Sequence, residues 1–585
     1  MTSTFPANTF EQVVNNLSVP ISKRAPPLPV GLWLALAAGL VLRAWYFSDL
    51  VAQPWFGYPL VDALTFDRTA LGILQEGHQG AFFRPPLYPL FLAAVYRVFG
   101  HSAGAVAWIQ FVLGLAALVP AYRLAERWFG ERAALAGVWI GACYPLRIFF
   151  EGETLDVTLF TFLLLGATWK LWQALEEGVL ARVFLAGLLY GAAALTRPNV
   201  LLALPFIAAG AALDFRIGWK RLLVPGLVGA LGVMLALAPV SLHNWRAEGA
   251  FMPVAANGGV NFFLGNERGS TGLTPVPPGL RWEQTMTRPV RAGQLTLSGQ
   301  DRWWYARAAK EIRAAPAHWL RLLWAKTALF VNAAESSNNK ALGHFTAASF
   351  PVRHYRWWYG VLVCLALPGL ATRPARTVAC FASIIAGFGV SVVLFFVSER
   401  YRLPIVPLLA PAAAAGAGEL ILAVRSRRGL RAAGLAALCA VAGLGVFPDW
   451  FGAGRERIDA DFQMGQIFLM RHEPERALGS LQKAHDANPQ NPDVLNSLGA
   501  ARVSSGDLDG AETAYRQALA LGDFAEIWFN LGVIAERRGP GHGATAAACY
   551  RRAIEINPAD GRPRANLAAL AAGENGDRTP RERGR

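Results

Sequence analysis

The chain has 585 residues, of which 54% are hydrophobic and 16% are charged, and its mean hydropathy is +0.31. Soluble globular proteins carry nearer to ~25% charged residues, so the composition indicates a membrane protein. Glycine and proline, with 58 and 36 residues, stand at ordinary levels, which excludes collagen-like and low-complexity chains. The net charge of +15 falls almost entirely on the first 454 residues. No basic-aromatic stripe or nucleic-acid-binding module accompanies it, so we expect no nucleic-acid partner.

The N-terminal region predicts a cytoplasmic segment followed by an uncleaved first span. Residues 1–27 are polar and end in Lys23, Arg24 and a proline-rich stretch. An apolar run from residue 28 to about residue 48 is long enough to cross ~30 Å of hydrocarbon. It is too long for a signal-peptide core and lacks a small-residue cleavage site. The two basic residues place the N-terminus in the cytoplasm.

Residues 28–450 are predicted to form a polytopic transmembrane helical bundle. Ten further apolar runs follow the first one, at residues 103–124, 132–150, 154–174, 183–196, 199–213, 220–242, 355–372, 377–397, 403–422 and 430–449. Basic connections between them should face the cytoplasm, which requires an odd number of spans, about 11. Two of the runs are short for full spans, so the prediction is about 11–13 spans. Residues 317–333 are assigned to an interfacial or re-entrant helix.

This topology turns two long loops, residues 49–102 and 243–316, toward the outer side of the membrane. Residues 151–153 and 398–402 emerge on the same side. The repeat region that follows the membrane domain would then be outside as well. For a bacterial chain, this corresponds to an inner (plasma) membrane protein with a periplasmic C-terminal domain.

Residues 458–572 show self-similarity with a period of 34 residues. The pairs Met464-Gly465, Leu498-Gly499 and Leu531-Gly532 occupy the same register, and small residues recur later in each unit. This pattern resembles the tetratricopeptide repeat, which implies an α-solenoid that docks a protein partner or acceptor. The alternative is that the repeats only brace the membrane domain. Residues 573–585 are predicted to be a disordered tail.

Two motifs in the first outward loop stand out, at residues 61–70 and 84–89. The first contains a carboxylate just beyond the first span, and the second is an Arg-Pro-Pro-Leu-Tyr-Pro segment. Four further stretches follow in order, at residues 149–153, 195–199, 257–266 and 400–404. Together they resemble the GT-C-type membrane glycosyltransferases, in particular the protein O-mannosyltransferase and aminoarabinose transferase group. The resemblance extends over residues 28–420 and implies an all-α, GT-C-like membrane domain.

The resemblance implies that the first-loop aspartate, here Asp62, is the catalytic carboxylate. Many relatives have Asp-Glu at this point, whereas this chain has Asp62-Ala63, which leaves Asp67, one helical turn on, as a substitute for the second carboxylate. Glycosyl transfer from a polyprenyl phosphate needs a base for the acceptor hydroxyl and cations for the departing phosphate. A carboxylate at a dry membrane boundary suits the base because desolvation raises its pKa. The alternative for Asp62 is an exposed loop residue or a helix cap.

Four arginines are candidates for binding the carrier phosphate. Arg400 and Arg402 stand at the outer mouth of a span, and guanidinium groups match phosphate geometry. The alternative is that they extend to the lipid headgroups. Arg197 lies between two short apolar runs and reaches the same surface, unless it is a plain topology marker. Arg84 is the fourth candidate.

Acidic and amide residues complete the predicted substrate site. Glu151 and Glu153 belong to an acidic cluster with Asp156, which could bind the acceptor or a divalent cation, Mg²⁺ or Mn²⁺. Glu153 could equally cap the next helix. Asn257 and Asn261 lie in a Gly/Asn-rich segment that forms a tight turn and could contact sugar hydroxyls. No cofactor is required by these motifs, and the metal ligands stay unassigned. Glu335, Asn338 and Asn339 form a further outward polar patch.

The sequence thus predicts a hexosyl or pentosyl transferase that moves a sugar from a polyprenyl-phosphate donor to a hydroxyl of a protein, lipid or glycan. Membrane lipid and a protein bound by the repeats are the other expected partners. The alternative from another class is a non-enzymatic scaffold for surface-polysaccharide or secretion machinery. A lipid-carrier transporter is disfavoured because the notable charges cluster at outer boundaries and not deep within spans.

Overall fold

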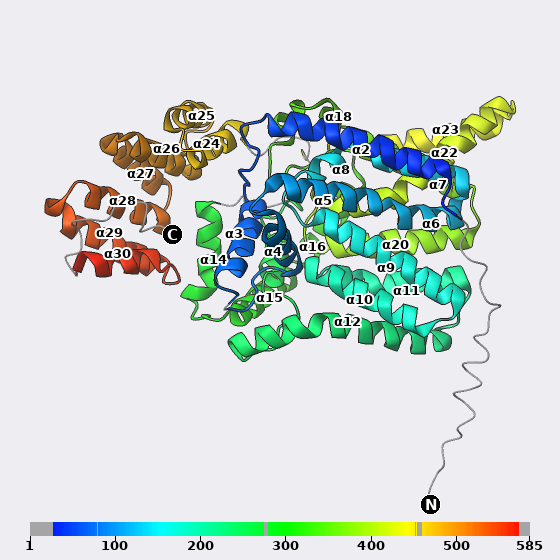
Figure 1. Cartoon of the computed structure of the whole chain (residues 1–585), viewed down its shortest axis with the longest axis horizontal. Coiled ribbons are helices and arrows are strands. Elements are labelled where there is room, and N and C mark those ends of the chain that lie inside the picture. Colours follow the sequence, from blue (N-terminus) through cyan, green and yellow to red (C-terminus); the bar gives the residue numbers. More distant parts are fainter. Residues whose placement is uncertain (1–26, 79, 274–278, 451, 453–458, 572–585) are drawn as a thin grey trace, which may run out of the picture.

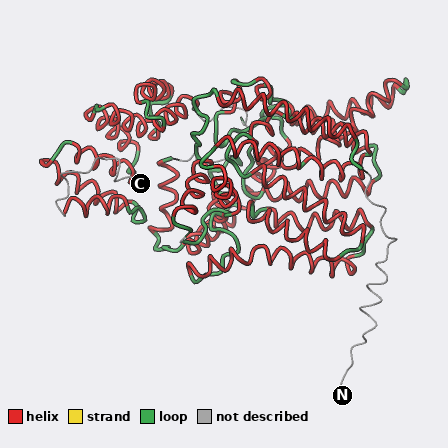
Figure 2. The backbone as a smooth tube through the Cα atoms, viewed as in Figure 1, coloured by secondary structure: helices red, strands yellow, loops and turns green. Residues whose placement is uncertain are grey.

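The structure is a computed structural model that describes residues 27–78, 80–273, 279–450, 452 and 459–571 (Figures 1 and 2). These residues fold into helices, with no strand among them. The fold class predicted from the sequence, an all-α membrane bundle followed by a helical repeat domain, is therefore confirmed. The predicted cytoplasmic segment, apart from its last residue, and the predicted tail lie outside the described ranges.

The described part of the first domain contains helices that are long and apolar enough to cross a membrane. By length and composition six stretches qualify: α2 (Val30–Val51), α5 (Ala103–Ala116) continued by α6 (Leu118–Phe129), α12 (Trp219–Glu248), α20 (Ala375–Val393), the segment Glu399–Arg425 and α23 (Gly429–Val446). A seventh is formed if α7 (Glu131–Cys143) and α8 (Pro145–Glu151), which meet at 53°, count as one span. Pro145 explains the bend, because proline begins a helix but cannot continue one.

The remaining apolar runs also form helices, but shorter ones. They are α4 (Leu87–Phe99), α10 (Leu180–Thr196), α11 (Val200–Phe215) and α19 (Trp358–Ala371), beside the mixed helix α9 (Val157–Glu177). Every run predicted from hydropathy thus lies on a helix, while the count of 11–13 spans stays a prediction. The run at 317–333 is α16 (Pro316–Val331).

Small residues allow the long helices to approach closely. A Cβ atom on Gly416 would lie 1.9 Å from the carbonyl oxygen of Leu365, and one on Gly369 would lie 2.1 Å from that of Ala412. These two glycines face each other across the contact between α19 and α22 (Val406–Arg425). Such contacts are typical of helices that associate in lipid, where van der Waals packing replaces the hydrophobic effect.

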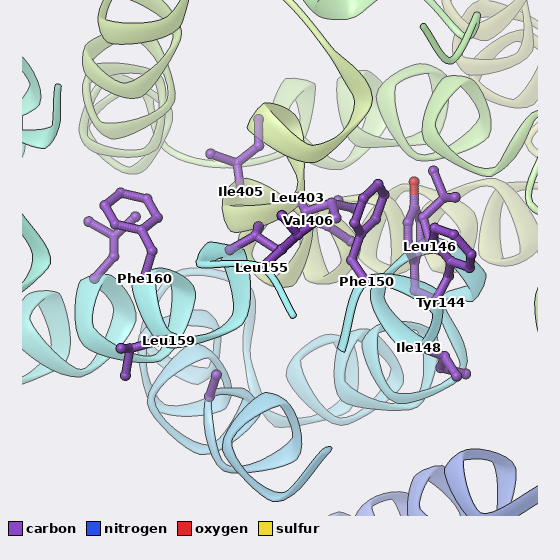
Figure 3. Packing of buried hydrophobic residues seen from close by; sticks show 14 of the residues in the cluster. Tyr144, Leu146, Ile148, Phe150, Leu155, Leu159, Phe160, Leu403, Ile405 and Val406 are labelled. Atoms are coloured by element: carbon purple, nitrogen blue, oxygen red, sulfur yellow. The ribbon is translucent and has the colours of Figure 1, made fainter. Parts of the chain in front are cut away.

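A hydrophobic cluster lies beneath the short helical turns that follow α20. Leu403, Ile405 and Val406 are buried and lie beside Leu155 and Phe160 of the α8–α9 region (Figure 3). The first two of these residues belong to the 3₁₀ turn η1 (Leu403–Ile405), which continues the single turn α21 (Glu399–Arg402). Packing of η1 against α9 fixes the position of the polar residues just before it.

An outer layer of shorter helices covers one end of the bundle (Figure 1). Figure 1 shows α3 (Asp62–Gln75), α14 (Leu280–Arg291) and α15 (Leu297–Ala314) at this end. Helix α13 (Gly258–Asn266) packs against α15, and α17 (Leu342–Ala347) packs against α18 (Phe350–Arg353), which lies beside α2. These helices belong to the two long loops predicted to face outward and to the segment after α16. The basic α6–α7 and α11–α12 connections lie at the opposite end of the bundle in Figure 1. The loops and the basic connections are therefore segregated, as the topology requires.

Residues 459–571, the described part of the repeat domain, stack seven α-helices: α24 (Ala460–Met470), α25 (Pro474–Ala487), α26 (Pro492–Ser505), α27 (Leu508–Leu521), α28 (Ala525–Arg537), α29 (Gly543–Ile556) and α30 (Arg562–Ala571). The recurring glycine of each unit lies against a large side chain of the next helix. A Cβ on Gly499 would meet the Tyr515 ring at 2.4 Å, and one on Gly532 would meet the Tyr550 ring at the same distance. The 34-residue register thus encodes helix packing, and the predicted α-solenoid is confirmed.

Candidate functional site

A cavity of about 380 Å³ lies where the outer layer meets the membrane helices. Its walls come from segments that are far apart in the sequence: 61–66, 83–85, 156, 196–199, 257–261, 282, 338–339, 391–396 and 400–401. Five charged residues line it, three of them arginines. Apolar walls with a few convergent polar groups are typical of binding sites. The cavity brings together six of the ten residues predicted for the site: Asp62, Arg84, Arg197, Asn257, Asn261 and Arg400.

Asp62 lies between two arginines in this cavity. Its Oδ1 accepts a hydrogen bond from Arg84 Nη1 at 2.6 Å, and its Oδ2 accepts one from Arg400 Nη2 at 2.5 Å. The side chains of Asp62 and Arg400 are 14% and 5% exposed, so both charges are largely removed from water. Burial acts to raise the pKa of Asp62, but the two guanidinium groups outweigh it and hold the pKa well below its ordinary value. The expectation of a raised pKa was therefore wrong for this state, because desolvation is not the only influence on the carboxylate.

The backbone before Asp62 is strained. Val61 has a φ of 55°, in a region that β-branched residues rarely adopt. Helix α3 begins at the next residue, so this conformation sets the direction in which Asp62 leaves the helix N-terminus. Strain of this kind persists where surrounding contacts hold it, and it clusters at functional sites.

A second charged group lies beside the first. Arg197 donates two hydrogen bonds to Asp156, at 2.9 and 2.6 Å, in a bidentate pair. Its guanidinium carbon lies 5.0 Å from the centre of the Tyr401 ring, and that of Arg400 lies at the same distance from the same ring. Tyr401 thus lies against both arginines, and we call the part of the cavity wall formed by Arg197 and Arg400 the basic wall. The sequence analysis noted Asp156 only as part of an acidic cluster, although a buried arginine such as Arg197 requires a carboxylate partner.

Arg402 points away from the cavity, although it is two residues from Arg400. It forms an ion pair with Glu335 and donates hydrogen bonds to the carbonyl oxygens of Leu329 and Asn332. These carbonyls belong to the last turn of α16 and the residue after it, where helix ends leave carbonyl oxygens with room for further donors. The structure thus gives Arg402 a structural role at the end of α16, and its predicted phosphate contact is not supported by its position.

Glu151 also lies outside the cavity. Its Oε2 accepts a hydrogen bond from Arg43 of α2 at 2.6 Å, and Arg147 lies 3.3 Å from its Oε1. All three side chains are buried. Glu151 is thus held inward by Arg43 of the neighbouring helix α2 and by Arg147 of its own helix, α8.

Asp67 and Glu153 line a separate cavity of about 120 Å³ on the other side of α3. Tyr96 donates a hydrogen bond to Asp67 at 2.6 Å, and His101 Nε2 lies 2.7 Å from the same oxygen. Glu153 pairs with Lys340 at 2.8 Å. Asp67 is therefore not a second carboxylate of the large cavity. Among the described residues no three His, Cys, Asp or Glu side chains are grouped so that they could hold a metal ion.

Two aromatic residues of the large cavity were not predicted from the sequence as site residues: Trp282, which reaches it from α14, and Tyr401. The predicted polar patch at Asn338 and Asn339 also lines the cavity, whereas Glu335 pairs with Arg402. Trp282 packs against Val260 and Trp304, which belong to helices of the same outward loop. Nothing in its local sequence distinguishes it from other loop aromatics.

Comparison with known families matches both parts of the chain. Residues 83–244 match the family described as dolichyl-phosphate-mannose-protein mannosyltransferase, and residues 462–525 and 498–561 each match the tetratricopeptide repeat. The predicted resemblance to membrane glycosyltransferases of this group, and the predicted repeats, are therefore confirmed. No curated protein matches the chain.

Solved structures with a similar arrangement are distant in sequence. The Archaeoglobus fulgidus oligosaccharyltransferase in complex with zinc and sulfate is 13% identical over 76% of this chain and 57% of its own, with a TM-score of 0.40. ArnT from Cupriavidus metallidurans bound to undecaprenyl phosphate is 14% identical over 88% and 79%, with a TM-score of 0.41. This chain thus spans little more than half of the archaeal enzyme, and neither likeness carries the functional argument.

Proposed function

We propose that this integral membrane protein is a glycosyltransferase that moves a sugar from a polyprenyl-phosphate donor to an acceptor hydroxyl in the large cavity. The observation that carries this proposal is the placement of Asp62 between Arg84 and Arg400 on the cavity wall. A carboxylate and a cluster of guanidinium groups are the two kinds of group that this reaction needs. The family match of residues 83–244 supports the same class of reaction.

The arginines suit the phosphate of the donor. Arg84, Arg197 and Arg400 all line the cavity, and each is neutralised by a carboxylate of the protein. A phosphate that enters competes with those carboxylates for the same fork-shaped donors. When the donor phosphate takes Arg400 and Arg84, Asp62 loses the two interactions that lower its pKa. Donor binding therefore converts Asp62 from a partner of arginine into a base.

The transfer step is a displacement at the anomeric carbon with inversion. Asp62 takes the proton of the acceptor hydroxyl while the hydroxyl oxygen forms a bond to that carbon. The bond between the anomeric carbon and the phosphate oxygen breaks, and its electron pair leaves with the carrier phosphate. The arginines stabilise the negative charge that develops on this leaving group.

The apolar side of the cavity suits the polyprenyl chain. Val392 lies near the end of α20, one of the helices long enough to span a membrane, and Phe395 and Phe396 follow it. A lipid carrier can therefore approach along the bilayer while its phosphate reaches the basic wall.

We place the cavity and the repeats on the outer, periplasmic face of a bacterial inner membrane, because the basic α6–α7 and α11–α12 connections lie at the other end of the bundle (Figure 1).

The test compares Asp62→Asn with wild type and with the matched variant Asp67→Asn, which changes a carboxylate on the same helix outside the cavity. Membranes that hold each protein are supplied with radiolabelled polyprenyl-phosphate sugars, and transfer into polymeric or protein material is measured. Loss of a general base lowers the rate by about 10²–10⁴-fold, so Asp62→Asn is expected to lose transfer. Equal transfer in Asp62→Asn and wild type, or no transfer in wild type with any donor, would contradict the proposal.

A further inference from the structure

A buried amide at the large cavity has no hydrogen-bond partner among the residues that the structure describes. Asn339 is 4% exposed and lines the cavity, and neither its side-chain nitrogen nor its side-chain oxygen has a hydrogen-bond partner. A buried polar group left without a partner costs about 1–3 kcal/mol, so such groups are rare and call for an explanation. Because Asn339 is one of the residues that line the cavity, a ligand bound there can supply the missing hydrogen bonds.

The repeat domain holds the backbone of this residue. Gln463 of α24 donates a hydrogen bond from Nε2 to the carbonyl oxygen of Asn339 at 2.7 Å, and its Oε1 accepts one from the N–H of Ala341 at 3.0 Å. Gln463 is itself 3% exposed. The Gln463 side chain of the first repeat thus fixes the segment that contains Asn339. Both the nitrogen and the oxygen of the Gln463 amide take part in this contact.

The missing partners define the chemistry of the ligand. An amide offers N–H donors and a carbonyl acceptor, so it is satisfied by groups that both accept and donate hydrogen bonds. Hydroxyl groups do both, whereas a phosphate at neutral pH chiefly accepts. The basic wall formed by Arg197 and Arg400 already suits the phosphate. A ligand with phosphate at one end and hydroxyls at the other would satisfy both parts of the cavity.

We propose that Asn339 hydrogen-bonds the hydroxyl groups of the donor sugar, and that Gln463 is the positioning residue that holds it there. This inference rests on the proposed glycosyl transfer and names a binding residue for it. The first repeat therefore completes the sugar site of the membrane domain, in addition to any protein that the solenoid docks. Removal of the repeats would remove the side chain that holds the backbone of Asn339 and Ala341.

The test uses the full chain in lipid nanodiscs and two ligands, the sugar-bearing carrier and the bare carrier phosphate. The variants are Asn339→Leu, which keeps the size and removes the amide, and Gln463→Glu, which keeps the acceptor for Ala341 and removes the donor to Asn339. The matched control is Gln466→Glu on the same helix. In the part of the chain that the structure describes, Gln466 makes no hydrogen bond to the segment 339–341.

Both test variants should bind the sugar-bearing carrier more weakly, by about tenfold, as expected for the loss of one or two hydrogen bonds. Their affinity for the bare carrier phosphate should match that of wild type, and Gln466→Glu should match wild type for both ligands. In transfer assays the KM for the donor should rise while kcat changes little. Hydrogen exchange of residues 338–347 should become faster in Gln463→Glu and stay unchanged in the control.

Four results would overturn the inference. An equal loss of affinity for both ligands would show a general structural defect, and unchanged affinity for the sugar-bearing carrier would show that Asn339 does not bind the sugar. A rise in KM for the acceptor alone would assign the amide to acceptor hydroxyls. Unchanged hydrogen exchange in Gln463→Glu would show that the repeat does not hold the segment. Wild-type protein that binds neither ligand would instead contradict the proposed function, and the exchange measurement would still decide the role of Gln463.

Discussion

Two aspartates on helix α3 lie in contrasting surroundings. Asp62 faces the large cavity and contacts two arginines, whereas Asp67 faces the small cavity and contacts Tyr96 and His101. They are five positions apart on one helix, so their side chains leave it in different directions. Both carboxylates are satisfied by hydrogen bonds at about 2.6 Å, and both side chains are largely buried.

The difference lies in what can replace each partner. An arginine that neutralises Asp62 can be taken over by an anion of a ligand, because a phosphate offers the same acceptors with more charge. The Tyr96 hydroxyl that satisfies Asp67 offers a phosphate no charge to neutralise. A carboxylate held by two arginines next to a large cavity is suited to catalysis, and one held by a phenol and a histidine beside a small cavity is suited to structure.

The largest effect should come from breaking the buried contact of Asp62. Arg400→Gln removes a guanidinium group whose side chain is 5% exposed. Asp62 then loses one of its two ion pairs, and the donor phosphate loses one of its cationic partners. Hydrogen bonds to charged groups contribute about 1.5–3 kcal/mol, so carrier phosphate should bind about 10–100-fold more weakly. Titration of the carrier into nanodiscs measures this. Arg431→Gln, which removes an exposed arginine at Glu419, is the control and should bind as wild type does.

Arg84→Gln should have a smaller effect in the same direction. The Arg84 side chain is 26% exposed, so water and salt screen its interaction more than that of Arg400. We expect a loss of carrier affinity of about fivefold, which grows smaller as salt concentration rises. The same titration at low and high salt provides the check. A loss as large as that of Arg400→Gln would show that the two arginines are equivalent.

Asp67→Asn should affect the stability of the protein and leave its transfer activity nearly unchanged, in contrast to Asp62→Asn. The amide keeps one acceptor but loses the charge that holds Tyr96 and His101, so the variant should be less stable by about 1–2 kcal/mol. Transfer activity should stay within about twofold of wild type, because Asp67 does not line the large cavity. Thermal unfolding and the transfer assay measure the two effects. Loss of transfer in a fully folded Asp67→Asn protein would restore Asp67 as a catalytic carboxylate.

The smallest expected effect is on the thermal stability of the protein at acid pH. The pKa of Asp62 is lower in the folded chain than in the unfolded one, so its ion pairs stabilise the fold above the unfolded value, ~4, and lose this effect as pH falls through the folded value. The difference in stability between wild type and Asp62→Asn should therefore be constant from about pH 5 to 7 and shift toward the variant below about pH 4. Thermal unfolding across this range measures it. A difference that stays constant down to pH 3 would mean that the pKa is not lowered.

The apolar runs and the 34-residue register were enough to predict the helices. Both patterns arise within a single helix or repeat unit, so they can be read from a short stretch of sequence. The cavity residues were found through the order of six short motifs, and it is long-range packing that brings Asp62 and Arg400 together. Arg402 could have been set apart from Arg400 by geometry alone, because two residues in a helical turn point about 200° apart. The hydrogen bond between Glu151 and Arg43 could not be predicted in this way, since Arg43 lies on another helix, 108 residues away in the sequence. Nor does a period of 34 reveal that Gln463 reaches the cavity wall.

The central claim is that the carboxylate of Asp62 and the phosphate of the donor compete for the same arginines. The most direct measurement is the affinity of Asp62→Asn for bare carrier phosphate, by titration in nanodiscs beside wild type. If the claim holds, the variant binds the carrier as tightly as wild type or more tightly, because Arg84 and Arg400 no longer have to leave a carboxylate, while transfer is lost. Weaker binding of the carrier by a folded Asp62→Asn protein would contradict it.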